Sequence, residues 1–226
     1  MKAKMEVKRV LNQLWHLGKC SDIYMFHHVT TQPEKLLSLT LETDAFLRFL
    51  DRPHTYASLA QTMEDKDYPG LSAITFDDGL QDAYTVAYPA LKERKIPFTL
   101  FVSSAFVGEP GYLSKDQLLE LAADPLVTVG VHGSRHRILT ECGPEDQAEE
   151  IFKSKEILEH LMGRPCDLFA YSHGQYNDTV RKLTAYAGYR MAFAVAGRPL
   201  NRRFDRGPYA FPRESVEEDT RAMFGL

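Results

Sequence analysis

The sequence predicts an α/β fold in which parallel strands form a sheet or a barrel. Short apolar runs typical of buried strands alternate with helix-type patterns through most of the chain, and about six or seven strands can be counted in that alternation. The clearest unit is a strand at 71–76, a helix at 82–95 and a second strand at 98–102. Such a strand–helix–strand connection makes its two strands parallel.

Apolar periodicity also predicts the elements that come before this unit. Residues 3–17 have the pattern of an amphipathic helix, and residues 22–29 (DIYMFHHV) have that of a strand. A helix is predicted at 43–50, with Thr43 or Asp44 as its N-cap. Within the helix at 82–95, Pro89 predicts a kink or a late restart.

The same alternation continues after the unit. Further strands are predicted at 126–131, 167–171 and 190–195, and further helices at 114–124, 144–162 and 177–187, the last of them capped by Asn177. The tail at 197–226 is richer in Arg, Pro and Gly. It is predicted to hold a strand near 209–211 and a short helix from about 215, and to belong to the same domain.

Composition excludes several classes of protein. The 226 residues are 44% hydrophobic and 26% charged, with a net charge of −4, which is ordinary for a globular protein and gives no basic footprint for nucleic acid. Cys20, Cys142 and Cys166 show no C-x-x-C spacing, so free thiols in a reducing compartment are expected. We expect no signal peptide and no transmembrane helix, because long apolar runs are absent, and therefore a cytoplasmic location.

Three polar clusters each follow an apolar strand. ITFDDG places Asp77 and Asp78 side by side, VGVHGSRH places His132 and His136 four residues apart, and FAYSHGQYN places Ser172, His173 and Gly174 at a strand end. The carboxyl ends of parallel strands emerge on one face of a sheet or barrel, where sites form. We therefore expect the three clusters to converge.

One carboxylate and two imidazoles suit a divalent metal ion, and three protein ligands leave a position open for water, as in catalytic sites. Such an ion lowers the pKa of water and polarises a carbonyl group, while a carboxylate outside the coordination shell can accept a proton. The alternative interpretations assign no function to these residues: paired Asp before Gly is common in turns, and H-x-x-x-H can arise by chance on a helix. All three clusters in order at strand ends favour the metal centre.

With these motifs, the sequence resembles the polysaccharide deacetylase family (carbohydrate esterase family four), whose members are metal-dependent and remove acetyl groups from N-acetylated sugars. The resemblance runs over about 23–193. The T-F-D-D-G motif matches residues 75–79 unchanged, and H-[ST]-x-x-H matches at 132–136. The resemblance implies a distorted (β/α) barrel of about seven parallel strands. Residues 1–226 are expected to form a single domain, in which 1–20 are an N-terminal helix and 197–226 are a C-terminal extension packed on the domain.

The same resemblance assigns roles to residues. Asp77 would be the general base, and Asp78, His132 and His136 would bind Zn²⁺ or another divalent ion such as Co²⁺ or Ni²⁺. The motif departs from the family at Gly133, where a Ser or Thr hydroxyl usually braces the loop. That substitution puts the rigidity of the loop in question and leaves the ligands in place.

The third motif, usually R-P-P-Y-G or A-Y-P-Y-G, here has Ser172 and His173 in place of Pro-Tyr. The resemblance implies that the His173 N–H stabilises the oxyanion, a role that survives a change of side chain. Whether the His173 imidazole contacts substrate or fills the wall is left open. Tyr171, Ser172 and Tyr176 are assigned to the substrate groove.

The family's usual C-terminal acid, a His in Leu-x-His, is missing, since no His follows Tyr189. A branch of biofilm exopolysaccharide deacetylases has Tyr-His-x-Val on the first strand, and residues 26–29 (FHHV) resemble it. His27 is thus the candidate acid, although strand alternation allows only one of His27 and His28 to face the barrel mouth. Arg213 resembles that branch's late Pro-Arg and would orient Asp77; the alternative is a solvated charge.

The predicted function is removal of an N-acetyl group from an amino sugar in a polysaccharide, a glycolipid or a sugar-nucleotide precursor. An amidohydrolase acting on a non-sugar amide or a cyclic imide is one alternative, and a degenerate glycan-binding protein is another. The expected partner is the N-acetylated sugar, not nucleic acid. The sequence leaves the oligomeric state open.

Overall fold

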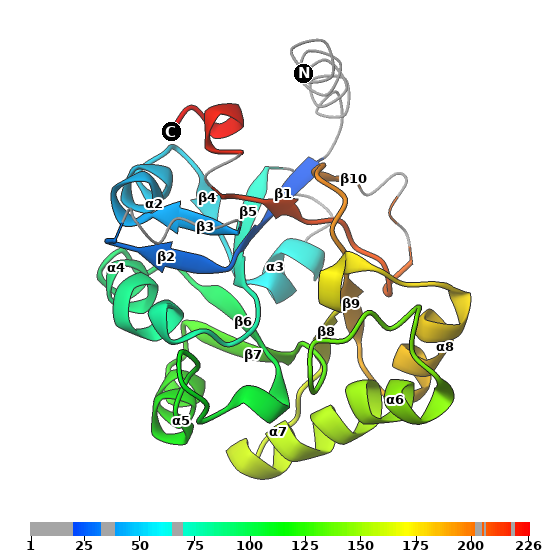
Figure 1. Ribbon diagram of the computed structural model, residues 1–226. Coiled ribbons are helices and arrows are strands. Elements are labelled where there is room, and N and C mark those ends of the chain that lie inside the picture. Colours follow the sequence, from blue (N-terminus) through cyan, green and yellow to red (C-terminus); the bar gives the residue numbers. More distant parts are fainter. Residues whose placement is uncertain (1–19, 33–38, 65–69, 202–204, 206, 218–219) are drawn as a thin grey trace.

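A computed structural model describes residues 20–32, 39–64, 70–201, 205, 207–217 and 220–226. A curled, mostly parallel sheet forms a half-barrel with helices packed around it (Figure 1). Along the sheet the strand order is β10-β1-β5-β6-β7-β8-β9, with β4 paired to β5 and β11 paired to β1. The prediction of an α/β barrel in one domain is confirmed.

The strands of the barrel are β1 (Cys20–Phe26), β4 (Thr55–Tyr56), β5 (Leu71–Phe76), β6 (Phe98–Val102), β7 (Val127–Val131), β8 (Leu168–Ala170), β9 (Met191–Phe193), β10 (Leu200–Asn201) and β11 (Glu214–Ser215). Only the β1–β10 pair is antiparallel among the described pairs. A small second sheet pairs β2 (His28–Thr30) with β3 (Thr40–Glu42) in parallel.

The α-helices are α2 (Thr43–Leu50), α3 (Leu59–Glu64), α4 (Tyr88–Glu93), α5 (Lys115–Ala123), α6 (Pro144–Ala148), α7 (Ser154–Met162) and α8 (Asp178–Tyr186). Two π-helical segments, η2 (Ala83–Ala87) and η4 (Glu149–Lys153), precede α4 and α7, and short 3₁₀ turns lie at η3 (Ser104–Phe106), η5 (Ser172–Gly174) and η6 (Arg221–Phe224). None of the described helices is long and apolar enough to span a bilayer.

Most predicted elements are confirmed within a few residues of their ends, and Asn177 caps α8 by accepting from the Val180 N–H. The predicted cap of α2 is wrong: Glu42 takes the N-cap position and makes no side-chain cap bond. The predicted helices at 82–95 and 144–162 each begin or continue through a π segment. Pro89 lies at the start of α4 directly after the π segment η2, so the helix changes its hydrogen-bonding pattern next to this proline.

Two further predictions are affected. The predicted strand 22–29 breaks at His27, so β1 and β2 belong to different sheets. At Glu214–Ser215 the chain forms β11, whose main chain pairs with β1, and the predicted final helix is confined to the short 3₁₀ segment η6 (Arg221–Phe224). The predicted helix at 3–17 lies outside the described residues.

Aromatic packing fixes β1 and β5 against α2. Phe26, Phe46 and Phe49 are fully buried, and Phe26 meets Phe46 and Phe49 edge-on at ring distances of 5.3 and 5.2 Å. Phe76, at the end of β5, stacks on Phe26 at 5.4 Å. Burying each such side chain stabilises the fold by about 1.5–3 kcal/mol, so the point where Asp77 leaves β5 is held firmly.

The C-terminal segment crosses from β9 to β1. Phe211 bridges Phe193 in parallel, and the Ala194 N–H donates to the Phe211 carbonyl. Three residues further on, β11 begins and pairs with Tyr24 and Met25 of β1. The segment therefore joins the two ends of the curled sheet and carries Arg213 into the interior, where that side chain is 0% exposed.

Candidate active site

Asp78, His132 and His136 come together where β5 and β7 end. One ligand atom from each lies within 4.8 Å of the others. Asp78 Oδ1 is 3.4 Å from His132 Nε2 and 3.3 Å from His136 Nε2. The convergence expected from the sequence is present in the structure.

This group fits a divalent cation. Asp78 Oδ1 is buried and has no hydrogen-bond partner, which is costly for a carboxylate oxygen unless a cation satisfies it. His132 Nδ1 lies 2.8 Å from the Ala170 carbonyl oxygen. That oxygen can only accept, so Nδ1 carries a hydrogen, and Nε2 is the ring nitrogen that faces Asp78 and can bind a metal ion. One oxygen and two imidazole nitrogens form a donor set typical of catalytic Zn²⁺.

Electrostatics at His136 favour the neutral, ligating imidazole. Burial, and then the His132 imidazole, lower the pKa of His136 to about 4. The backbone is also unusual here: Asp78 has φ 72° and His136 has φ 57°. Such left-handed residues cost about 1–3 kcal/mol each and gather at functional sites. The fold therefore holds both ligands in conformations that an unconstrained chain would avoid.

Asp77 Oδ2 lies 3.7 Å from His132 Nε2, at the edge of this group, and both oxygens of Asp77 also meet Arg213. Arg213 Nη1 donates to Asp77 Oδ1 at 2.6 Å and Nη2 donates to Oδ2 at 2.7 Å. Burial alone would raise the pKa of Asp77, but the charges of Arg213 and His132 outweigh it and hold that pKa well below the ordinary range. Arg213 Nη1 also donates to Thr75 Oγ1 at 3.2 Å. Arg213 thus lies where a residue that orients Asp77 has to be.

Glu150 braces the loop between His132 and His136, a role that the sequence did not indicate. Its carboxylate accepts from the N–H groups of Ser134 and Arg135 at 2.9 and 2.8 Å. A Cβ added to Gly133 would lie 2.3 Å from Glu150 Oε2. The carboxylate therefore occupies the space that a side chain at 133 would fill, and the loop keeps a brace despite the missing hydroxyl. The one sign of this brace in the sequence was the glycine at position 133, whose φ is 79° in the structure.

His27 and His28 face different surroundings because the chain leaves the sheet between β1 and β2. His27 is 8% exposed and interacts electrostatically with Asp77 and Asp78. Burial lowers the pKa of His27, and the two carboxylates oppose that effect. His28 is half-exposed, and its Nδ1 lies 2.6 Å from Asp82 Oδ2. His27 therefore belongs to the candidate site, and His28 belongs to a neighbouring cavity.

The third motif places His173 beside the site. Its ring centroid is 4.5 Å from that of His136, and φ at His173 is 57°. The His173 main chain lies in η5, next to the candidate metal site. A main-chain N–H at this place is the kind of donor that an oxyanion would need.

The other residues of this motif correct an expectation. Tyr171 and Ser172 are fully buried, and their hydroxyls donate to the carbonyls of Tyr209 and His132 at 3.0 and 3.3 Å. Because both side chains are engaged inside the protein, neither is free to contact a substrate. Tyr176 is 40% exposed and lines a cavity of about 410 Å³ together with Arg181, Arg198 and residues 205–210 that the structure describes.

Comparisons with known proteins agree with this geometry. A family model described as "Polysaccharide deacetylase" matches residues 64–192, more than half of the chain. The Bacillus subtilis (strain 168) protein YxkH, named as a polysaccharide deacetylase, is 30% identical over 160 residues, covering 71% of this chain and 56% of that protein. A poly-β-1,6-N-acetyl-D-glucosamine N-deacetylase of Staphylococcus aureus (strain MRSA252) is 26% identical over 159 residues, covering 65% and 54%. The chain thus spans little more than half the length of these relatives.

Solved structures share the fold. IcaB from Ammonifex degensii superposes with a TM-score of 0.77 at 24% identity, covering 92% of this chain and 96% of that one. The Streptococcus pyogenes deacetylase PplD in complex with acetate gives a TM-score of 0.77 at 23% identity, covering 89% and 94%. At these identities the likeness establishes a common fold.

Proposed function

This chain belongs to the polysaccharide deacetylase family, and we propose that it hydrolyses the N-acetyl group of an amino sugar in a glycan with a divalent metal ion held by Asp78, His132 and His136. The observation that carries the proposal is the buried, unpartnered Asp78 Oδ1 lying 3.4 and 3.3 Å from two imidazole Nε2 atoms. A bound Zn²⁺ or similar ion would supply Lewis-acid chemistry, activating water and polarising the acetamide carbonyl.

Asp77 is the proposed general base. Its two oxygens each accept one hydrogen bond from Arg213, and an ionised carboxylate has further lone pairs to take a proton from water. The lowered pKa keeps the carboxylate ionised at neutral pH. Arg213 is thus the proposed positioning residue for Asp77.

His173 and His27 complete the proposed reaction. As water attacks the acetamide carbon, the carbonyl oxygen gains negative charge, and the His173 N–H is the donor proposed to receive it. The C–N bond then breaks and the sugar nitrogen needs a proton, which His27 would give. Burial lowers the pKa of His27 and leaves the imidazole neutral beforehand. That acid role therefore requires that a proton reaches His27 during turnover, and Asp77 is the neighbouring group that has just taken one from water.

The substrate class is proposed from the relatives. The Staphylococcus aureus relative is named for poly-β-1,6-N-acetyl-D-glucosamine, so we propose β-linked N-acetylglucosamine units for this chain. The test is acetate release from N-acetylglucosamine oligosaccharides by the zinc-loaded protein, with Asp77→Asn alongside. We expect acetate from the wild type and a loss of about 10²-fold or more in kcat for the variant. Glycan binding without acetate release, or ring-opening of a cyclic imide in its place, would overturn the proposal.

A further inference from the structure

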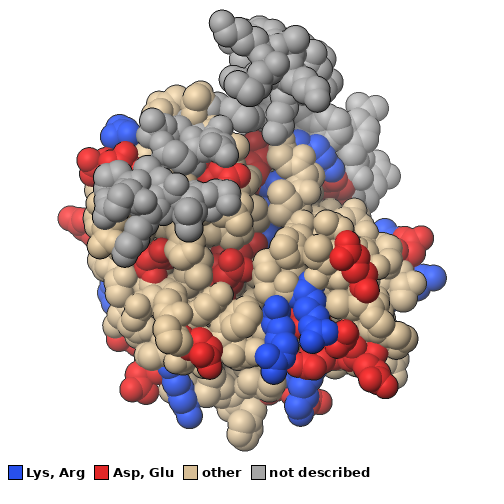
Figure 2. Space-filling view, viewed as in Figure 1, with Lys and Arg blue, Asp and Glu red and all other residues tan. Residues whose placement is uncertain are grey.

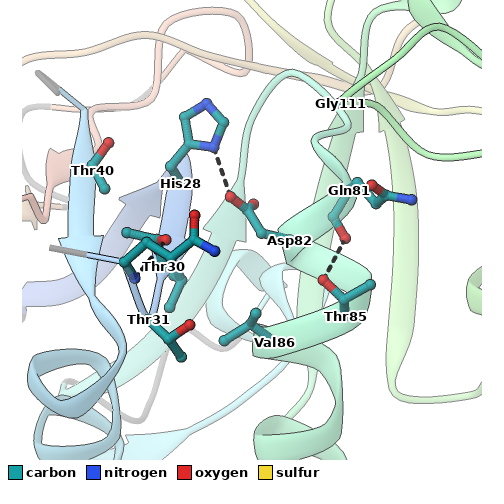
Figure 3. A pocket seen from close by; sticks show the side chains of 11 residues that line it. His28, Thr30, Thr31, Thr40, Gln81, Asp82, Thr85, Val86 and Gly111 are labelled. Atoms are coloured by element: carbon teal, nitrogen blue, oxygen red, sulfur yellow. Dashed lines mark hydrogen bonds and ion pairs between the residues drawn. The ribbon is translucent and has the colours of Figure 1, made fainter. Parts of the chain in front are cut away.

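Ion pairs at the surface of this chain and the pair in its interior differ in what holds them. Figure 2 shows basic and acidic side chains interspersed over the face viewed there, and exposed pairs fix the geometry of their side chains only weakly. Figure 3 shows such a pair at a pocket, where His28 Nδ1 lies 2.6 Å from Asp82 Oδ2 and the His28 side chain is half-exposed. Arg213 and Asp77 are buried, so neighbouring groups of the protein have to orient them.

Arg213 is held by more than its carboxylate partner. Nη1 and Nη2 each donate to one oxygen of Asp77, and Nη1 also donates to Thr75 Oγ1 at 3.2 Å. Nε lies 3.5 Å from the Ala194 carbonyl oxygen, which is long for a hydrogen bond. Among the residues that the structure describes, Thr75 thus accepts the shortest hydrogen bond from the guanidinium after those to Asp77.

The Thr75 hydroxyl can serve Arg213 only as an acceptor. Thr75 is fully buried, and its hydroxyl donates its single hydrogen to the Tyr24 carbonyl at 2.9 Å, a group that can only accept. Since a guanidinium can only donate, the two partners fix the rotation of the hydroxyl. In a buried chain of this kind, each hydrogen bond polarises the next. The hydroxyl oxygen is therefore presented to Nη1 in one defined direction.

The same part of β1 also fixes the main chain next to Arg213. Glu214, the following residue, begins β11 and pairs with Tyr24. Thr75 belongs to β5, whose register with β1 places it opposite Met25. The main chain that carries Arg213 and the hydroxyl that meets its guanidinium are thus both attached to one short stretch of β1. Thr75 is the link on the side-chain end.

Thr99 shows that a buried threonine in this part of the sheet need not have such a partner. It lies on β6 in register with Thr75, and both side chains are 0% exposed. Within the described part of the chain, Thr99 Oγ1 has no hydrogen-bond partner. The two hydroxyls share burial and strand environment, and they differ in their contact with Arg213.

We propose that Thr75 is a positioning residue for the reaction, because its hydroxyl holds the Arg213 guanidinium in the orientation that meets both oxygens of Asp77. The proposal rests on the proposed function, in which Asp77 takes the proton from water. Without the hydroxyl, one Nη1 hydrogen loses its acceptor, and the guanidinium turns to find another and takes the carboxylate with it. The hydrogen bonds of the Thr75 side chain go to Tyr24 and Arg213, so the proposed metal ligands are left in place.

The test removes the hydroxyl at nearly constant size. Thr75→Val is compared with Thr99→Val, the matched control that removes a hydroxyl without a partner, and with Thr75→Ser, which restores the hydroxyl. Acetate release from N-acetylglucosamine oligosaccharides by the zinc-loaded proteins gives kcat and KM, and competition with a chromophoric chelator gives the zinc affinity. Thr75→Ala, which places no methyl group against the guanidinium, is the second variant in case Thr75→Val fails to fold.

We expect kcat to fall about tenfold in Thr75→Val, while KM and zinc affinity change by less than about twofold. Thr75→Ser should retain kcat within about threefold of the wild type, and Thr99→Val should show no loss. An equal fall in both valine variants, or a wild-type kcat in Thr75→Val or Thr75→Ala, overturns the proposal. So does a loss that Thr75→Ser fails to restore.

Crystal structures of the wild type and Thr75→Val separate this proposal from the proposed function, because they require no activity. A guanidinium that leaves its two-pronged contact with Asp77 in Thr75→Val supports the role of the hydroxyl. If the wild type releases no acetate, the same displacement sinks the proposed function and still supports the contact that Thr75 makes. An unaltered geometry of Arg213 and Asp77 in Thr75→Val overturns the positioning role, whatever the activity of the wild type.

Discussion

Arg213 and Asp77, 136 positions apart in the chain, form a buried bidentate ion pair with N–O distances of 2.6 and 2.7 Å. Arg213 is 0% exposed and Asp77 is 1% exposed. A buried ion pair offsets the cost of desolvation only when its geometry is good and its remaining hydrogen-bonding groups are satisfied. Arg213 Nη1 meets that demand by also donating to Thr75 Oγ1, and its guanidinium lies 5.2 Å from the centre of the Phe101 ring.

The first prediction concerns this ion pair. Arg213→Lys keeps the charge and loses the two-pronged geometry, so we expect kcat to fall about tenfold or more while KM changes little. Arg213→Ala leaves a buried carboxylate without a partner and should lower the free energy of unfolding by about 3–5 kcal/mol. Acetate-release kinetics and urea unfolding measure the two effects. An Arg213→Lys protein with wild-type kcat would show that the orientation of Asp77 is unimportant.

The second prediction concerns metal binding. In the wild type, Zn²⁺ at about 100 times its dissociation constant should stabilise the fold by about 2.7 kcal/mol, and a chelator should remove that gain. Asp78→Asn replaces an anionic ligand with a neutral amide and should abolish most of the stabilisation. Asp116→Asn, in the exposed first turn of α5, is the matched control. Equal zinc-dependent shifts in melting temperature for the two variants would contradict the assignment.

The third prediction concerns Glu150 and Gly133. Glu150→Ala removes the acceptor of the Ser134 and Arg135 N–H groups and should cost about 1–3 kcal/mol for each group left buried and unpaired. Gly133→Ser alone should also destabilise, because its Cβ would lie 2.3 Å from Glu150 Oε2.

The double variant, Gly133→Ser with Glu150→Ala, gives the new hydroxyl the vacated space. It should be more stable than the sum of the single changes predicts, by about 1 kcal/mol. Urea unfolding and zinc affinity of all four proteins complete the cycle. Strict additivity would mean that the two positions do not share one space.

The fourth prediction separates the candidate acid from other histidines. His27→Gln should lower kcat by about 10²-fold or more, since a glutamine cannot give a proton to the leaving amine. His160→Gln, at an exposed position of α7, is the control and should leave kcat unaltered. Zinc affinity should be retained in both variants, because His27 is not one of the three ligand residues. A His27→Gln enzyme with normal kcat would remove His27 from the reaction.

The fifth prediction concerns pH and His28. The hydrogen bond to Asp82 raises the pKa of His28 above its ordinary value of 6.5, against the opposing effect of burial. A histidine whose pKa is raised on folding adds stability below the unfolded pKa, and the gain is lost as pH rises through the folded value. His28→Gln should therefore lower the melting temperature more at pH 5.5 than at pH 9. An equal difference at both pH values would show that His28 gains no proton affinity on folding.

Local pattern was enough to predict most of the fold. Buried strands such as 71–76 and 98–102 are short apolar runs, and the three motifs follow strands whose carboxyl ends meet in space by topology. Asn177 as a helix cap follows from its side chain alone.

What the sequence could not predict depends on contacts between distant segments. Strand periodicity gave no sign that the chain leaves the sheet at His27, which separates His27 from His28. Glu150 looks like any helix glutamate until the loop beneath it is placed. Tyr171 and Ser172 adjoin a functional motif in sequence, yet their hydroxyls donate hydrogen bonds to carbonyl groups of other segments.

The crossing of the C-terminal segment from β9 to β1 has a consequence for biosynthesis. β1 is among the first described residues to be translated, and its partners β10 and β11 are among the last. Until these emerge from the ribosome, one edge of β1 stays unpaired and is exposed to association with other nascent chains. Arg213, whose guanidinium pairs with Asp77, is translated together with these late residues. Folding yield and catalytic competence should therefore be acquired together, once β10, β11 and Arg213 have been translated.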